Sequence, residues 1–107
     1  MQKTSSTKPK IKVNNHLKGV FGETTTTPGK RAVVEINVKA HKNHVFKKSY
    51  TLKQALADTV KHELDHAHHP KKKEKTVYKD TSKFMKKASN KQVDKLVREL
   101  KKGKYNG

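Results

Sequence analysis

The 107-residue chain is predicted to form one α+β domain, because strand-like and helix-like patterns occupy different parts of the sequence. Apolar and polar residues alternate at 31–39, whereas apolar residues recur at spacings of three and four after residue 52. Two Ser/Thr-x-x-Gln patterns in the second part are typical of helix starts. We therefore expect a β-hairpin or small antiparallel sheet packed on one long helix, with two further helices after it.

The N-terminal segment is expected to differ from the rest of the chain. Residues 1–9 are polar, rich in lysine and end at Pro9, so they are predicted to form a disordered basic arm. A single domain at 10–107 then follows, and the alternating residues 10–13 can begin a strand.

Two segments are expected to pair as the hairpin. Residues 31–39 are the clearest strand, since the even-numbered positions of 32–38 are all apolar and share one face. Residues 17–23, which contain glycine and apolar side chains, are predicted to form a shorter, irregular partner strand. The segment 24–29, with four threonines and a Pro-Gly pair, indicates the turn between them. Residues 40–49 form a basic connection to the helices.

The main helix is predicted at about 52–69. Thr51 and Gln54 make a capping box at its start, and Pro70 ends it. An apolar stripe at helical spacing is expected to pack on the sheet. The stripe consists of Leu52, Leu56, Val60, Leu64 and Ala67.

Two more helices are expected after Pro70. The first spans about 72–87, and the second begins at a capping box of Ser89 and Gln92 and runs to about Lys102. Their predicted apolar contacts are Val77, Phe84 and Met85 in the first, and Val93, Leu96, Val97 and Leu100 in the second.

The charge of the chain points to anionic partners. The formal net charge is +18, and such a charge attracts nucleic acid or anionic surfaces without a specific site. The alternative interpretation is a solvated, highly soluble surface. The three Tyr and three Phe are scattered and form no base-stacking pattern. No apolar run approaches the length of about 18 residues that a membrane span needs, so we expect no membrane partner.

The main helix carries the pattern HExxH, from His62 to His66. Two imidazoles four residues apart lie one turn apart on the same face, where both can bind one zinc ion. The carboxylate of Glu63 between them is placed to act on a water molecule. The His pair lies beside the apolar stripe, whereas Asp58 and Asp65 are expected to point outward. The alternative is a pair of surface histidines on a basic helix.

A zinc site needs a third protein ligand. The longer pattern HExxHxxGxxH would require Gly at 69 and His at 72, but the chain has His69 and Lys72. Glu74 is favoured, because a chain that turns back after Pro70 can present this carboxylate from the first turn of the next helix. It also lies alone among lysines, where it could simply balance their charge. The chain lacks cysteine, and the candidates are Glu74, Asp80, His68, His69, His41 and His44.

These motifs together resemble a known family. The matching segments are FGET at 21–24, EIN at 35–37 with His41-Lys42, the HExxH helix preceded by Asp58-Thr59-Val60, and His69-Pro70 followed by Glu74 and Val77. Over about residues 17–100 the chain is similar to small single-domain zincins, the minigluzincin-like metallopeptidases of prokaryotes and phages. The resemblance implies a minimal zincin-like domain in which His62, His66 and Glu74 bind Zn²⁺. It also implies a zinc-dependent peptidase with Glu63 as general base.

The expected substrate is a peptide or protein, which could pair with the strand at 31–38 by β-addition. Tyr78, His68 and His69 are candidates to stabilise the oxyanion. We expect a monomer in the cytoplasm, or in the host cytoplasm if a phage encodes the chain. Two alternatives stay open. One is a highly basic nucleic-acid-binding protein with a structural zinc or none, and the other is a zincin fold that has lost its activity.

Overall fold

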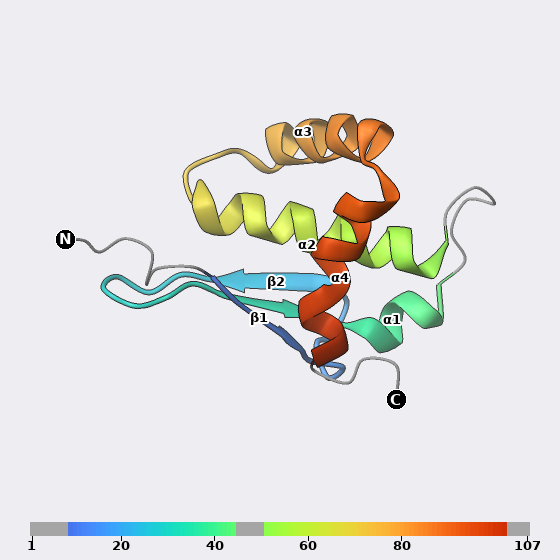
Figure 1. Ribbon diagram of the computed structural model, residues 1–107. Coiled ribbons are helices and arrows are strands. Elements are labelled where there is room, and N and C mark those ends of the chain that lie inside the picture. The colour runs from blue at the N-terminus through green and yellow to red at the C-terminus, as the bar shows by residue number, and fades with distance from the viewer. Residues whose placement is uncertain (1–8, 45–50, 103–107) are drawn as a thin grey trace.

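The sheet and the helices that cover it are formed by residues 9–44 and 51–102, which the computed structural model describes. Except for Pro9, the basic arm expected at 1–9 lies outside these residues. The described residues form an α+β domain with a mixed three-stranded sheet and four helices, so the predicted class is confirmed (Figure 1). In chain order the elements are β1 (Lys10–Val13), β2 (Gly22–Thr25), β3 (Val33–Ile36), α1 (Val38–Lys42), α2 (Leu52–His68), α3 (Glu74–Lys87) and α4 (Asn90–Lys102).

Strand β3 is the centre of the sheet, with β1 on one side and β2 on the other. The β2–β3 pair is antiparallel and pairs Thr24 with Val34, so the expected hairpin is confirmed. The prediction of a purely antiparallel sheet is wrong, because β1 pairs with β3 in parallel and sets Ile11 beside Val34. The partner strand also starts later than the predicted 17–23, and Thr24 and Thr25 belong to it rather than to the turn.

The turn between β2 and β3 has the geometry that its Pro-Gly pair predicts. The Lys30 N–H donates to the Thr27 carbonyl at 3.0 Å, which closes a four-residue turn. Gly29 has a φ of 77°, a conformation that a side chain at this position would strain. Pro28 followed by glycine with positive φ is typical of a type II turn.

Strand β3 ends earlier than the predicted 31–39, because Asn37 starts a helix. Its side-chain oxygen accepts from the Ala40 N–H at 2.9 Å, and its amide nitrogen donates to the Leu17 carbonyl at 2.9 Å. The chain therefore turns into α1 at Val38, inside the segment that was expected to be a strand.

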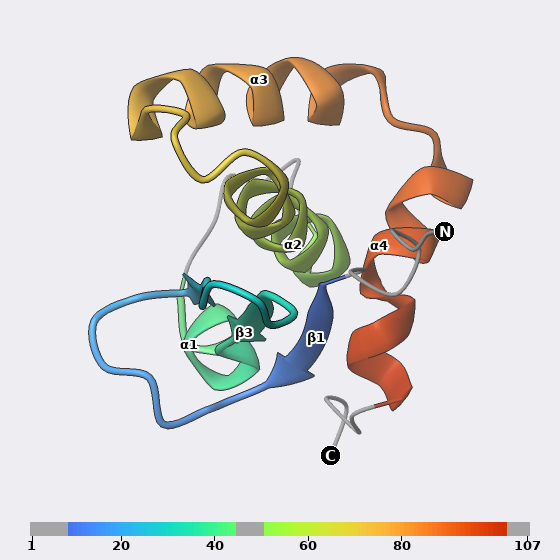
Figure 2. The ribbon, with the colours of Figure 1, turned by 90° about the vertical axis from the view of Figure 1, so that its left-hand side faces the viewer.

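Helix α2 runs along one face of the sheet, with α3 on the side of α2 away from the sheet and α4 at the edge near β1 (Figure 2). Both halves of the capping box of Thr51 and Gln54 are present, as predicted. The first turn of α2 projects beyond the strands (Figure 1), and Leu52 is 37% exposed, so its predicted place in the stripe is wrong. The core cluster comprises Val34, Ile36, Val38, Leu56, Ala57, Val60, Val93, Val97 and Leu100.

The two C-terminal helices follow the predicted order. The Ser89 N–H donates to the Gln92 side chain at 2.8 Å, and the Gln92 N–H donates to the Ser89 hydroxyl at 3.2 Å, which confirms the second capping box. Helix α3 begins at Glu74 rather than at Lys72. None of the helices in the described part of the chain has the length and apolar character needed to cross a membrane.

Candidate metal centre

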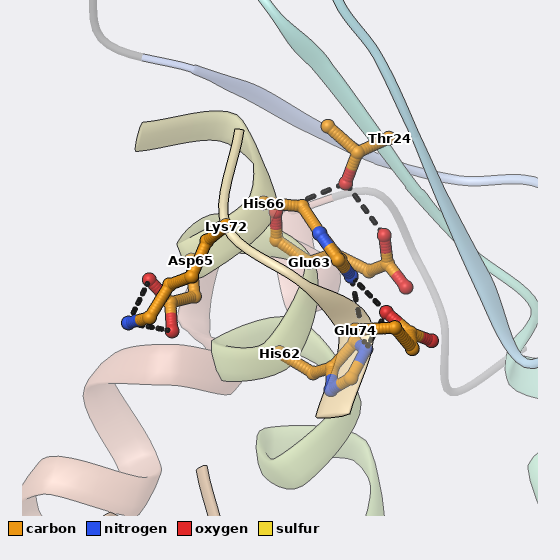
Figure 3. A network of polar contacts seen from close by, with 7 residues as sticks. All are labelled: Thr24, His62, Glu63, Asp65, His66, Lys72 and Glu74. Atoms are coloured by element: carbon orange, nitrogen blue, oxygen red, sulfur yellow. Dashed lines mark hydrogen bonds and ion pairs between the residues drawn. The ribbon is translucent and has the colours of Figure 1, made fainter. Parts of the chain in front are cut away.

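Three side chains from two helices converge beside the sheet (Figure 3). His62 and His66 lie on successive turns of α2, and Glu74 is the first residue of α3. The Nε2 atom of His62 lies 3.2 Å from the Nε2 atom of His66 and 3.2 Å from Glu74 Oε1. The Nε2 atom of His66 also contacts Glu74 Oε1. These residues form a group that can hold a metal ion, and their role as zinc ligands stays a prediction.

The group is open on one side. The side chains of His62 and His66 are 10% and 23% exposed, whereas that of Glu74 is 59% exposed. The imidazoles are therefore fixed by packing, and solvent reaches the group past the carboxylate. The ring of Tyr78, on the next turn of α3, lies 4.6 Å from the His62 ring, measured between centroids. It covers one face of that imidazole.

Glu63 is buried on α2 and is held by strand β2. The hydroxyl of Thr24 lies 2.6 Å from Glu63 Oε1 and 2.9 Å from the Glu63 carbonyl oxygen. A hydroxyl has one proton to donate, so it serves one of these two acceptors at a time. The other carboxylate oxygen, Oε2, does not take part in this contact. The sequence predicted Thr24 only as a turn residue. Its place in the FGET segment was the one sequence signal for its contact with Glu63.

Gly22 lets β2 approach α2 closely enough for this contact. A Cβ atom at this position would meet Thr59 Cγ2 at 2.8 Å and Glu63 Cγ at 3.1 Å. Real Cβ atoms essentially never show the first of these separations. The glycine is therefore required by close packing on the helix that carries the His pair.

Lys72 joins the two helices of the group at their connection. Its ammonium donates to Asp65 of α2 at 3.0 Å and to Asp80 of α3 at 2.6 Å (Figure 3 shows the first contact). The hydrogen bonds to Asp80 and then Asp65 raise the pKa of Lys72, and the bond from Lys72 lowers the pKa of Asp80. Asp80, a candidate third ligand, is thus turned to Lys72 instead.

Two predictions about α2 are wrong for one physical reason. Asp65 was expected to point outward but is half-buried against Lys72, and Asp58 is half-buried at the wall of a cleft. Helix α3 covers the side of α2 that lies away from the sheet (Figure 2), so α2 has two covered sides rather than one.

The remaining candidate ligands lie apart from the group. His68 and His69 are exposed at the end of α2, and His44 is exposed with its ring against Phe21. His41 is buried, with Nδ1 2.7 Å from the Asn37 carbonyl and Nε2 2.7 Å from the Thr59 hydroxyl.

The contacts of His41 set the tautomer of its neutral ring. A carbonyl oxygen accepts only, so Nδ1 carries a proton, and in the neutral ring Nε2 accepts from the Thr59 hydroxyl. Burial lowers the pKa of His41, against the opposite effects of the Asn37 bond and the charge of Asp58. His41 is therefore a neutral structural residue that ties α1 to α2.

Two hollows flank the group. A cleft of about 740 Å³ lies between the start of β2, α2 and α3, and has His62, Glu63 and Glu74 in its wall. A smaller hollow of about 280 Å³ is lined by Glu63 and His66 together with β2 and the loop after it. The apolar part of the larger cleft includes Val20, Phe21, Tyr78 and Met85.

Comparison of the chain with protein-family models, with curated proteins and with solved structures finds no match.

Proposed function

We propose that this protein is a zinc-dependent peptidase, in which His62, His66 and Glu74 bind Zn²⁺ and Glu63 is the general base. The observation that carries the proposal is the convergence of three ligand atoms beside a buried carboxylate. Zinc binds its ligands at about 2.0–2.1 Å with tetrahedral angles, which sets ligand atoms about 3.3 Å apart. The two separations of 3.2 Å at His62 agree with this value, whereas His66 Nε2 and Glu74 Oε1 lie closer together and would have to move apart around a zinc ion.

The donor set fits zinc better than Ca²⁺ or Mg²⁺. Two imidazoles and one carboxylate suit zinc in an open site, whereas Ca²⁺ and Mg²⁺ prefer oxygen ligands. The order of strands, HExxH helix and Glu74 helix also agrees with a minimal zincin-like domain. Zinc bound here would lower the pKa of water towards about 7 and polarise a carbonyl group.

Glu63 has the surroundings that a general base needs. The hydroxyl of Thr24 hydrogen-bonds one carboxylate oxygen and so fixes the orientation of the side chain. The second oxygen can then accept a proton from water and pass it to the leaving amine. Both hollows are lined in part by Glu63, so a substrate lying in either one passes this carboxylate.

Strand β2 is the element on which an extended peptide would bind. The strand expected for this role, 31–38, contains β3, which is paired on both sides and has no free edge. Strand β2 has β3 on one side only, within the described sheet. Gly22 lines the larger cleft and Thr24 the smaller hollow, so the edge of β2 runs past the metal group from one to the other. A peptide added to this edge would cross the group.

Tyr78 is the favoured oxyanion donor among the three candidates. It lines the larger cleft beside His62, and its side chain is exposed. His68 and His69 do not line either hollow.

Metal content and cleavage test the proposal separately. The purified protein should contain stoichiometric zinc, and His66→Ala should lose it, whereas the exposed control His68→Ala should keep it. Glu63→Gln should keep zinc but cleave a mixed peptide library about 10²–10⁴ times more slowly, as measured by mass spectrometry. Unchanged cleavage by Glu63→Gln would overturn the mechanism. Zinc without any cleavage by the wild type would favour a structural zinc or a zincin fold without activity.

A further inference from the structure

The outer face of α3 carries a row of lysines that the metal group does not explain. Lys75, Lys79, Lys83 and Lys86 are all exposed. At 100° per residue they fall within an arc of about 80° on the side opposite the buried Val77. We call these four residues the α3 lysine face.

The lysine face is only partly compensated within the described residues. Glu74 contacts the His pair, and Asp80 pairs with Lys72, although the nearby charges of Lys79 and Lys83 also lower the pKa of Asp80. None of the ion pairs found in the described part of the chain includes a lysine of this face. Like charges at a spacing of four residues destabilise a helix, so the row works against the folding of α3. Folding does not account for this arrangement, whereas a soluble surface or a binding role does.

We propose that the α3 lysine face binds the phosphate backbone of double-stranded nucleic acid. From Lys75 to Lys86 the helix rises about 16 Å, and over this axial length each strand of a duplex carries about five phosphates. The cations are regularly spaced on a rigid rod, as the phosphates of a duplex are. This binding is independent of the metal group, so it stands even if the protein does not cleave peptides.

The composition of the face favours a duplex over other anionic partners. It contains no aromatic side chain on which unpaired bases could stack, so a single strand gains little from it. It contains no apolar side chain that could enter a membrane, because the apolar residues Val77, Phe84 and Met85 of α3 lie outside its arc. It also lacks Asn and Gln, which read adenine, and Arg, and its lysines can read guanine only, so binding should depend little on sequence.

The face adjoins the larger cleft. Lys86 belongs to both the face and the wall of the cleft, and α3 carries Tyr78 on the cleft side. A duplex bound along α3 would bring other proteins on the same duplex close to the cleft. The face would thereby direct the site towards substrates that are themselves bound to nucleic acid.

The test measures the affinity of the full chain for a mixed-sequence DNA duplex of about 20 base pairs by fluorescence anisotropy. Salt is varied from about 50 to 200 mM. Four phosphate contacts predict a slope of log K against log salt of about −3.6, or roughly a hundredfold loss over this range. The triple variant K75Q/K79Q/K83Q should make the slope shallower by about 2.7. Glutamine is a good helix former, so α3 should remain folded.

Two controls make the result decisive. K91Q/K95Q/R98Q removes the same charge from exposed positions of α4 and should leave the slope close to that of the wild type. Equal changes in both triple variants would overturn the proposal, because binding would then follow total charge. The charge-retaining K75R/K79R/K83R should bind as the wild type does. Binding to phosphatidylserine vesicles but not to the duplex, or preference for a single strand of equal length, would also overturn it.

Discussion

Replacing Gly22 by alanine tests the close approach of β2 to α2. The added Cβ would lie 2.8 Å from Thr59 Cγ2, 3.1 Å from Glu63 Cγ and 3.3 Å from the Glu35 carbonyl oxygen. The hydroxyl of Thr59 contacts the His41 ring at 2.7 Å, so its methyl group cannot turn away without breaking that contact. Overpacking of this kind destabilises a protein by about 1–3 kcal/mol.

The backbone of Gly22 does not by itself forbid alanine. Its φ is not positive, unlike that of Gly19 and Gly29, and without a clash alanine would stabilise the fold by about 0.4–1 kcal/mol. A measured loss would therefore report on contacts rather than on backbone strain. If the free energy of unfolding falls by about 1–3 kcal/mol, the melting temperature should fall by roughly 4–20 °C.

A double-mutant cycle identifies the cause. Thr59→Ser removes the offending methyl group and keeps the hydroxyl that His41 contacts. Urea denaturation of the wild type, both single variants and Gly22→Ala/Thr59→Ser gives the coupling free energy. We expect Gly22→Ala to destabilise the Thr59→Ser protein by at least about 0.5 kcal/mol less than the wild type. An equal loss in both backgrounds would refute the reasoning.

Three further predictions follow from the site. Chelation of zinc should lower the melting temperature measured by calorimetry, by roughly 10–20 °C if the metal is present at about a hundred times its Kd; an unchanged melting temperature would contradict metal binding. Lys72→Met should weaken zinc affinity about 10–100-fold in a competition titration, because Glu74 is no longer oriented, whereas the exposed control Lys71→Met should not. Burial lowers the pKa of His41, so the unfolded chain binds more protons, and stability should fall as the pH drops below about 6.5. With chelator present, the loss between about pH 7.5 and 5.5 should be smaller in His41→Gln, and an equal loss would exclude this cause.

Helix starts were predictable because their signals are local. Each capping box lies within four consecutive residues, and both are present at Thr51 and Ser89. The parallel pairing of β1 with β3 could not be predicted in this way, since the two strands are joined through the whole of β2. The exposure of Leu52 was also missed, because periodicity does not reveal how far a helix extends beyond the sheet that it covers.

The site was predictable to the extent that it depends on helical geometry. The one-turn spacing of His62 and His66 follows from the period of α2, and the reversal after Pro70 made a contact with Glu74 plausible. The contacts of Thr24 and Lys72 depend on how separate elements dock, and no local pattern contains that information.

The docking of α3 shows why these tertiary contacts matter for a metal site. Its buried residues are Val77 and Thr81, and the hydroxyl of Thr81 has no hydrogen-bond partner within the described structure. Val77 and the half-buried Met85 provide apolar packing for α3, and the polar contacts at its start add to the docking. Lys72 links α3 to α2 through Asp80 and Asp65, and Glu74 links them through the His pair. Metal binding and the orientation of α3 should consequently be coupled, because Lys72, which holds α3 against α2, lies two residues before the ligand candidate Glu74.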